Sequence, residues 1–371
     1  MTVFGVTNAR RGPELPDFPW DVLADHAAVA RSHSGGVVDL SVGTPVDPVP
    51  GLIRDALASA SNFPGYPATH GTPRLREAAV DALRRRHGVD GLDADAVLPT
   101  IGSKELVALL PTLLGVRAGD LVVIPELAYP TYEVGARMAG ADWIRTDGLT
   151  ALGPRKPALV WLNSPGNPTG RVLGVEHLRK VVHWARERDA IVVSDECYLA
   201  LGWDTEPLSV LRPEVNEGRL DGVIAVHSLS KSANLAGYRA GFLTGDPALV
   251  KNLLSIRKHV GLIVPRPVQE AMTAALAEDG HVADQRARYA ARRAVLREAL
   301  TGAGFTIEHS EAGLYLWATR DEDAWETVAW FAERGILVAP GTFYGPSGKN
   351  HVRVAITATD ERVAVAAERL A

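Results

Sequence analysis

The chain has 371 residues, of which 46% are apolar and 22% charged, and its formal net charge is −5. This is ordinary for a globular protein. Because both signs of charge are spread along the chain without a strongly basic face, we expect no nucleic-acid partner. The single cysteine, Cys197, excludes an internal disulfide. We therefore expect no metal centre and a reducing, cytoplasmic location.

Neither a membrane span nor a secretory signal is expected from the sequence. No apolar run is long and uncharged enough to cross a bilayer, so we expect no membrane partner. Residues 1–20, "MTVFGVTNARRGPELPDFPW", lack an apolar core followed by a small-residue cleavage site, which argues against a secretory signal.

Short apolar runs alternate with amphipathic segments through the first two thirds of the chain. Most of these runs are apolar throughout, as in strands covered on both faces of a parallel sheet. Residues 174–189 show the apolar spacing of a helix. The alternation predicts an α/β fold with a mostly parallel, doubly wound sheet. The expected strands are residues 121–125, 158–163, 191–195, 222–228 and 240–245.

The C-terminal third mixes helices and strands without long buried runs, which predicts a smaller α+β unit. Residues 284–304 have the pattern of a long helix ending at a glycine. The runs "LYLWAT", "GILVAP" and "HVRVAIT" then indicate strands. We expect a large domain over residues 41–262, and a smaller one that combines residues 1–40, an N-terminal arm, with residues 263–371.

Polar residues follow the predicted strands repeatedly. In open α/β sheets the carboxyl ends of the strands meet at one edge, where ligands bind. Taken singly, most of these polar residues have a structural explanation, because Asn in a Pro/Gly turn and Asp or Ser at a helix start are common. Lys231 is the exception, since a lysine directly after a buried strand is unusual. The residues concerned are Gly102, Ser103, Lys104, Asn167, Asp195, Tyr198, Ser228, Ser230 and Lys231.

Together these residues describe one ligand. A lysine can capture an aldehyde as a Schiff base. Hydroxyls, an arginine and helix-start amides can hold an anion. A carboxylate can keep a ring nitrogen protonated. Pyridoxal 5′-phosphate has all three groups, so we expect it as the cofactor.

Four motifs in order make the chain similar to the class I/II aminotransferases of fold type I, which depend on pyridoxal phosphate. They are "NSPGNPTG" at 163–170, "SDECY" at 194–198, "SLSKSANLAGYRAG" at 228–241 and "HVRVA" at 351–355. The resemblance runs from "LSVGTPVDPVP" to the C-terminus. It implies a large cofactor-binding domain, a smaller domain, and a homodimer with shared active sites.

The resemblance also implies roles for individual residues. Lys231 matches the lysine that holds the cofactor and moves the substrate α-proton, and Asp195 matches the partner of the ring nitrogen. Asn167 and Tyr198 match the pair that hydrogen-bonds the ring's phenolic oxygen. The implied phosphate and ring contacts are Ser228, Ser230, Arg239, the start of the helix at Gly102, Ser103 and Lys104, the stacking Tyr129, and Tyr66 reaching the neighbouring subunit.

Arg353 matches the family's arginine that grips the substrate α-carboxylate, and Gly43 matches a glycine whose amide meets the same group. The residues alone leave a second interpretation open for Arg353. Val352 and Val354 flank it, so strand alternation would also suit an arginine on an edge strand that faces water.

Among aminotransferases of different substrate, the sequence most resembles the actinobacterial-type N-succinyldiaminopimelate aminotransferases. This implies transfer between N-succinyl-L,L-2,6-diaminopimelate and 2-oxoglutarate, substrates that each carry a second carboxylate. A second cation is therefore needed, and we expect Lys104, with Arg266 as a weaker candidate. Tyr315 is expected on the substrate side.

Other functions remain open at this point. One is an aminotransferase acting on aspartate, aromatic or branched amino acids. Another is a pyridoxal-phosphate carbon–sulfur β-lyase, which shares the same motifs. A cofactor-binding regulator would need a DNA-binding region, for which we see no segment. Cys197 is expected to be a small buried residue without a catalytic role.

Overall fold

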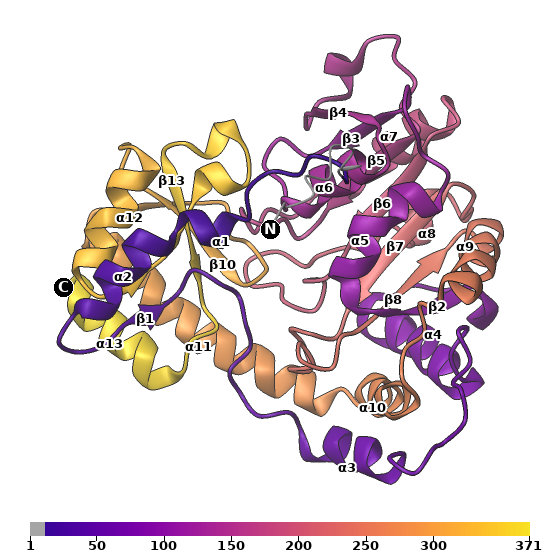
Figure 1. Ribbon diagram of the computed structural model, residues 1–371, viewed down its shortest axis with the longest axis horizontal. Helices are drawn as coiled ribbons and strands as arrows, with labels where there is room; N and C mark the ends of the chain where they lie inside the picture. The colour runs from indigo at the N-terminus through magenta and orange to yellow at the C-terminus, as the bar shows by residue number, and fades with distance from the viewer. Residues whose placement is uncertain (1–11) are drawn as a thin grey trace, which may run out of the picture.

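The computed structural model describes residues 12–371 and consists of two units joined by a long helix (Figure 1). The expectation of no secretory signal rests partly on residues 1–11, which lie outside the described residues. The large unit contains a seven-stranded sheet in the order β2-β8-β7-β6-β5-β3-β4. Only β8 runs antiparallel to its neighbours. The strands are β2 Val97–Ile101, β3 Leu121–Ile124, β4 Asp142–Arg145, β5 Leu159–Asn163, β6 Ile191–Asp195, β7 Val223–Ser228 and β8 Ala240–Gly245.

Helices cover both faces of this sheet, which confirms the predicted α/β class. Along β5, Leu159 and Trp161 pack on one face, and Val160 and Leu162 on the other. This alternation explains why the strands are apolar at every position. One face packs against α5 Gly102–Leu113, α6 Thr131–Met138 and α9 Pro247–Val260. The other packs against α3 Gly51–Ser59, α4 Pro73–His87, α7 Val175–Arg186, α8 Pro213–Asn216 and α10 Arg266–Ala277.

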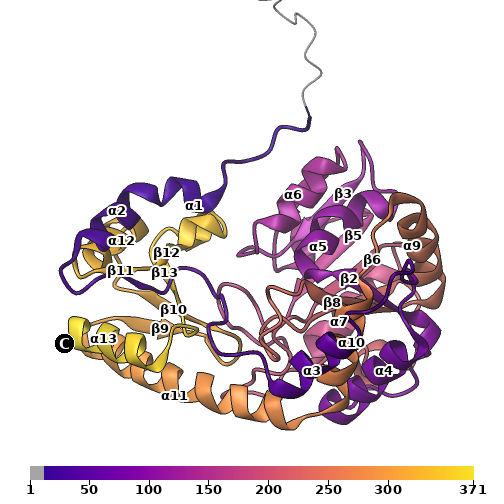
Figure 2. The same ribbon diagram turned by 60° about the horizontal axis from the view of Figure 1, so that its bottom comes forward.

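The small unit is built on a four-stranded antiparallel sheet in the order β12-β13-β10-β9, with a short parallel pair, β1 and β11, beside it. The N-terminal helices α1 and α2 pack here, as Figure 2 shows. Its elements are α1 Pro19–Val22, α2 Ala24–Ser32, β1 Val38–Asp39, β9 Thr306–Glu308, β10 Tyr315–Thr319, α12 Ala324–Glu333, β11 Ile336–Leu337, β12 Ala339–Pro340, β13 His351–Ala355 and α13 Asp360–Leu370. Short 3₁₀ turns occur at η1 Ala94–Ala96, η2 Leu149–Leu152, η3 Gly341–Phe343 and η4 Pro346–Gly348.

The boundary between the units differs in detail from the sequence expectation. Helix α11, Gly280–Gly302, begins before the predicted start at residue 284 and runs from the large unit to the small one (Figures 1 and 2). Helix α10 was expected in the smaller domain. Its Ala271, Met272 and Ala275 are instead buried in the core of the large unit, because they pack on α3 and α4. The division of the chain into domains stays a prediction.

No helix within residues 12–371 is both long enough and apolar enough to cross a membrane.

Candidate active site

A cavity of about 430 Å³ lies between the two units, at the carboxyl ends of β5, β6 and β7. The topology brings together residues that are far apart in sequence, as the polar residues after the strands predicted. Gly102 does not line the cavity itself, but it directly precedes the lining residue Ser103. The lining includes Gly43, Ser103, Lys104, Tyr129, Asn167, Asp195, Tyr198, Ser228, Ser230, Lys231, Arg239, Tyr315 and Arg353.

Lys231 enters the cavity from the loop after β7. Its Nζ donates to the carbonyl oxygen of Gly43. Burial lowers the pKa of this ammonium, and the nearby cations of Arg353 and Arg239 lower it further, although Tyr315 opposes them. For Gly43, the contact in the structure is therefore made by its carbonyl. The predicted role of its amide stays a prediction.

Asp195, the last residue of β6, is a buried carboxylate. Tyr132 Oη donates to Asp195 Oδ2 over 2.8 Å, and the amide of Cys197 donates to Oδ1 over 3.2 Å. Burial raises the pKa of Asp195 and these hydrogen bonds oppose the rise. Among residues 12–371 no cation lies within ion-pair distance of this carboxylate. Sequence reasoning missed Tyr132, which occupies an ordinary core position on α6.

Tyr198 and Tyr315 meet across the cavity, with 3.2 Å between their hydroxyl oxygens. Burial raises the pKa of Tyr198 well above its ordinary value. Burial acts the same way on Tyr315, but the cations of Arg353 and Lys231 outweigh it and lower the pKa of that phenol. The expected position of Tyr315 on the cavity wall is thus observed.

Arg353 is only 3% exposed, and the edge-strand interpretation is wrong because β13 lies between β12 and β10 in the sheet. Its Nη1 donates to Asn167 Oδ1 over 2.9 Å and its Nη2 to the carbonyl oxygen of Ser41 over 2.6 Å. The guanidinium carbon lies 3.9 Å from the ring centroid of Tyr315. Its buried Nε has no partner, and no carboxylate within the described chain pairs with it. A buried cation without an anion is costly, so this site suits an anionic ligand.

A concave anion site lies at the start of α5. Gly102 has φ +70°, and a Cβ added there would lie 2.3 Å from Arg239 Nη2. The left-handed backbone favours glycine here, and any larger residue would also displace the guanidinium of Arg239. Ser228 Oγ accepts from the amide of Ser230 over 3.2 Å, and both serines line the cavity together with Ser103 from the start of α5.

Past Lys104 the cavity adjoins a second chamber of about 700 Å³. Lys104 Nζ lies 5.3 Å from the ring centroid of Phe18, on the N-terminal arm. Phe18, Trp20, Lys104 and Tyr129 line both spaces. The sequence predicted an arm here but gave no reason to place its aromatic side chains at the site.

Two residues singled out from the sequence lie elsewhere. Tyr66 is 99% exposed and does not line the cavity of its own chain. Its predicted contact with a neighbouring subunit stays a prediction. Arg266 pairs with Glu270 at 2.7 Å and lies over the ring of Phe63, so it does not supply a cation to this cavity.

Residues 35–370 match the family model for class I and II aminotransferases. The chain belongs to this family. A probable aminotransferase of Mycobacterium tuberculosis is 64% identical over 100% of this chain and 89% of its own length. The 4-dedimethylamino-4-oxo-anhydrotetracycline transaminase OxyQ of Streptomyces rimosus is 58% identical over 96% of this chain and 99% of its own. The structure of a probable N-succinyldiaminopimelate aminotransferase from Thermus thermophilus superimposes with a TM-score of 0.86, at 31% identity over 95% of this chain and 99% of that one.

This aminotransferase depends on pyridoxal phosphate, as its family does. The cofactor supplies an aldehyde that exchanges amino groups and a ring that takes up electrons. The cavity fits it. Asp195 is a buried carboxylate that lacks a cation within the described chain, which suits a protonated ring nitrogen. The cradle of Gly102 and Arg239 suits a phosphate, and Lys231 lines the same cavity.

Proposed function

We propose that this aminotransferase interconverts N-succinyl-L,L-2,6-diaminopimelate and 2-oxoglutarate with N-succinyl-2-amino-6-oxopimelate and glutamate. The observation that carries the proposal is the continuation of the cavity around Lys231 and Arg353 into the chamber of about 700 Å³. Glutamate is short enough for the first cavity alone. A long N-acylated side chain needs the second space as well. The Thermus thermophilus neighbour, a probable N-succinyldiaminopimelate aminotransferase, supports the same substrate.

The reacting end of the substrate is held by the small unit in this proposal. Arg353 donates from its guanidinium to the α-carboxylate, which supplies the anion that this buried cation lacks. The amide of Gly43 meets the same carboxylate. Lys231 would take the proton from the substrate α-carbon and deliver it to the cofactor's side of the new carbon–nitrogen linkage, which is the net proton shift that amino-group transfer needs. Burial lowers the pKa of Lys231, which favours the neutral amine that can act as a base.

The large unit would hold the cofactor. Asp195, itself held by Tyr132, would pair with the ring nitrogen, while Asn167 and Tyr198 would hydrogen-bond the phenolic oxygen. Tyr129 would pack against the ring. The phosphate contacts are Ser228, Ser230 and Arg239 with the start of α5 at Gly102, Ser103 and Lys104.

Lys104 reads the distal carboxylate. It stands where the two spaces meet, and within residues 12–371 no carboxylate pairs with it. Arg145, also on the chamber wall, already pairs with Glu133 at 3.0 Å. Burial lowers the pKa of Lys104, with Arg239 adding to the effect. A carboxylate bound beside Lys104 would raise this pKa again, because an anion stabilises the ammonium form. Binding of the distal carboxylate next to Lys104 is therefore favourable.

The proposal includes a cytoplasmic homodimer in which Tyr66 reaches the phosphate of the other subunit. The side chain of Tyr66 is 99% exposed on a single chain. This exposure supports the contact, because a second subunit would bury an apolar ring that is otherwise left in water. Sedimentation of the purified protein tests the dimer. Cofactor retention in Tyr66→Phe then tests the contact, with half-buried Tyr238→Phe, which does not line the cavity, as the control.

A second candidate function comes from OxyQ, a 4-dedimethylamino-4-oxo-anhydrotetracycline transaminase, whose name indicates an anhydrotetracycline ketone as substrate. A fused-ring ketone would suit a chamber lined by Phe18, Trp20 and Phe343. The β-lyase alternative predicts pyruvate release from cystathionine. Both enter the assays as competing outcomes.

The test of the distal-carboxylate role compares Lys104→Met with Lys251→Met, an exposed lysine on α9. We expect the Lys104 change to lower kcat/KM for the succinyl substrate roughly tenfold or more, because a charged hydrogen bond is lost. An amino acid without a distal carboxylate, such as alanine, should be affected much less. Equal losses for both amino acids would contradict the role of Lys104.

A further inference from the structure

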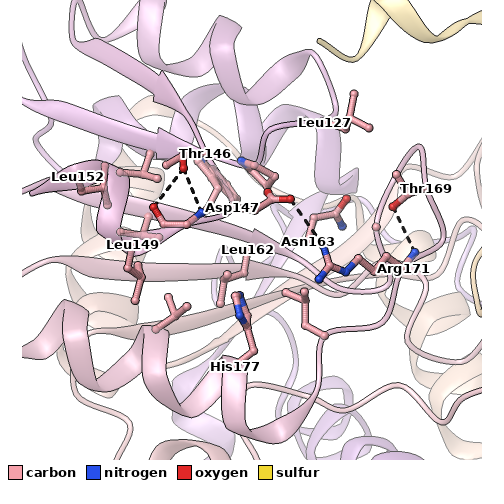
Figure 3. A pocket seen from close by; sticks show the side chains of 18 of the residues that line it. Leu127, Thr146, Asp147, Leu149, Leu152, Leu162, Asn163, Thr169, Arg171 and His177 are labelled. Atoms are coloured by element: carbon pink, nitrogen blue, oxygen red, sulfur yellow. Dashed lines mark hydrogen bonds and ion pairs between the residues drawn. The ribbon is translucent and has the colours of Figure 1, made fainter. Parts of the chain in front are cut away.

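A separate cavity of about 160 Å³ lies behind the catalytic one, on the α7 side of the sheet. Figure 3 shows it between the turn at Thr146–Leu149 and the side chain of His177 from α7. Asn163, at the end of β5, is common to this cavity and to the catalytic one. None of the proposed catalytic roles uses the remaining residues around it.

The interior of this cavity is apolar. Leu149 and Leu152 lie on one side and Leu162 forms part of the floor (Figure 3), while Val181 lines it from α7. The short turn η2 and helix α7 cover the sheet side by side here, and the space between them over β3 and β5 is left incompletely filled.

The rim carries one charge of each sign. Arg171 Nη1 and Asp147 Oδ2 are 3.8 Å apart, too far for a hydrogen bond, and their side chains are 48% and 55% exposed. Asp147 Oδ1 accepts from the amide of Glu126 over 3.0 Å, which fixes the carboxylate at the rim. Each charged group therefore keeps bonding capacity for a ligand of opposite sign.

We propose that this cavity binds a free aliphatic α-amino acid as an effector. The apolar side chain fills the leucine-lined interior, the carboxylate pairs with Arg171 and the ammonium pairs with Asp147. A purely apolar ligand would leave the charged pair unused, and a simple anion would be repelled by Asp147. A zwitterion with an apolar tail matches both parts of the cavity.

Two connections link this cavity to catalysis. Asn163 Oδ1 accepts from the amide of Asn167 over 2.8 Å, and Asn163 Nδ2 donates to the carbonyl of Asp195 over 2.9 Å. His309, from the small unit, also lines the cavity. Next to it, the amide of Ser310 donates to the carbonyl of Thr169 over 2.9 Å, across the junction of the units.

The ligand therefore binds best when the two units are held together as in this structure. By linkage, an effector that favours this arrangement changes substrate affinity, and substrate changes effector affinity by the same factor. This inference does not depend on which amino acid the catalytic site accepts.

The test is calorimetric titration of the cofactor-loaded enzyme with L-leucine. We expect saturable binding that Arg171→Gln and Asp147→Asn each weaken roughly tenfold or more, as for loss of a charged hydrogen bond. Both positions are half-exposed, so the changes leave the core intact. Arg84→Gln, which breaks an exposed pair with Asp81 on α4, is the matched control and should bind as the wild type does.

Binding at the catalytic site must be distinguished from binding here. Leucine bound in the 160 Å³ cavity should leave the absorption spectrum of the cofactor unchanged. Arg353→Lys should leave the affinity of the enzyme for leucine unchanged. Leu149→Phe, which fills the interior, should abolish binding. The proposal is overturned if the wild type shows no binding heat at millimolar leucine. It is also overturned if Arg353→Lys abolishes binding while Arg171→Gln does not.

Discussion

Replacement of Arg353 by lysine probes the feature on which the substrate assignment depends. Arg353 is a buried guanidinium held by Asn167 Oδ1 and the Ser41 carbonyl, with a buried Nε left without a partner. Lysine keeps the positive charge but has one point of contact in place of a planar fork. The substrate carboxylate then loses one charged hydrogen bond and keeps a poorly aligned second one.

The transition-state stabilisation lost in the lysine variant amounts to about 2–4 kcal/mol, since each hydrogen bond to a charged group contributes about 1.5–3 kcal/mol. This corresponds to a fall in kcat/KM of roughly 30- to 900-fold. The assay follows the cofactor's absorbance during the half-reaction with glutamate. Arg288→Lys, whose side chain is 55% exposed, is the control and should change the rate by less than about twofold.

Melting curves and the cofactor spectrum of the Arg353 variant establish that it is folded and loaded. A folded, loaded variant whose kcat/KM for glutamate lies within about threefold of the wild type would refute the assignment of Arg353.

Three further predictions concern Gly102 and Tyr132 at the cofactor site and Glu196, a buried carboxylate next to Asp195 in the chain. Gly102→Ala should weaken cofactor retention roughly tenfold on dialysis, because alanine is strained at φ +70° and its Cβ would push the Arg239 guanidinium out of the cradle; unchanged retention would contradict the cradle. Tyr132→Phe removes a 2.8 Å hydrogen bond to Asp195 and should slow turnover roughly fivefold without unfolding the protein; an unchanged rate and cofactor spectrum would count against it. Burial raises the pKa of Glu196 to about 7 from its ordinary 4.5, so the stability due to its neutral form is present below pH 4.5 and lost as pH rises to about 7. In urea unfolding, Glu196→Gln should therefore gain on the order of 3 kcal/mol relative to the wild type between pH 4.5 and 8, and an equal difference at both pH values would contradict this.

Much of the large unit could be predicted because its signals are local. Each apolar run was long enough to identify a buried strand, and β3, β5, β6, β7 and β8 lie where those runs predicted. The polar residues after these strands meet in one cavity because parallel strands end at the same edge of the sheet.

Features that depend on distant parts of the chain were not predictable in this way. Strand alternation around Arg353 does not reveal which strands flank β13, so its burial became clear only from the sheet order. Phe18 and Trp20 reach the site because the arm packs beside α5 and α6, far away in sequence. Tyr132 has the spacing of any core residue on a helix, and its hydroxyl acquires meaning only through its contact with Asp195. Nothing local separates α10 from the helices of the small unit.

The most direct test of the proposed substrate is the half-reaction of the wild-type enzyme, followed by the absorbance of its cofactor. The purified, cofactor-loaded protein is mixed separately with glutamate, N-succinyl-L,L-diaminopimelate, aspartate and cystathionine. The proposed function predicts rapid loss of the cofactor's yellow band with the first two and a weak response to aspartate. Loss of the band with aspartate and none with the succinyl compound would contradict it, and so would pyruvate release from cystathionine.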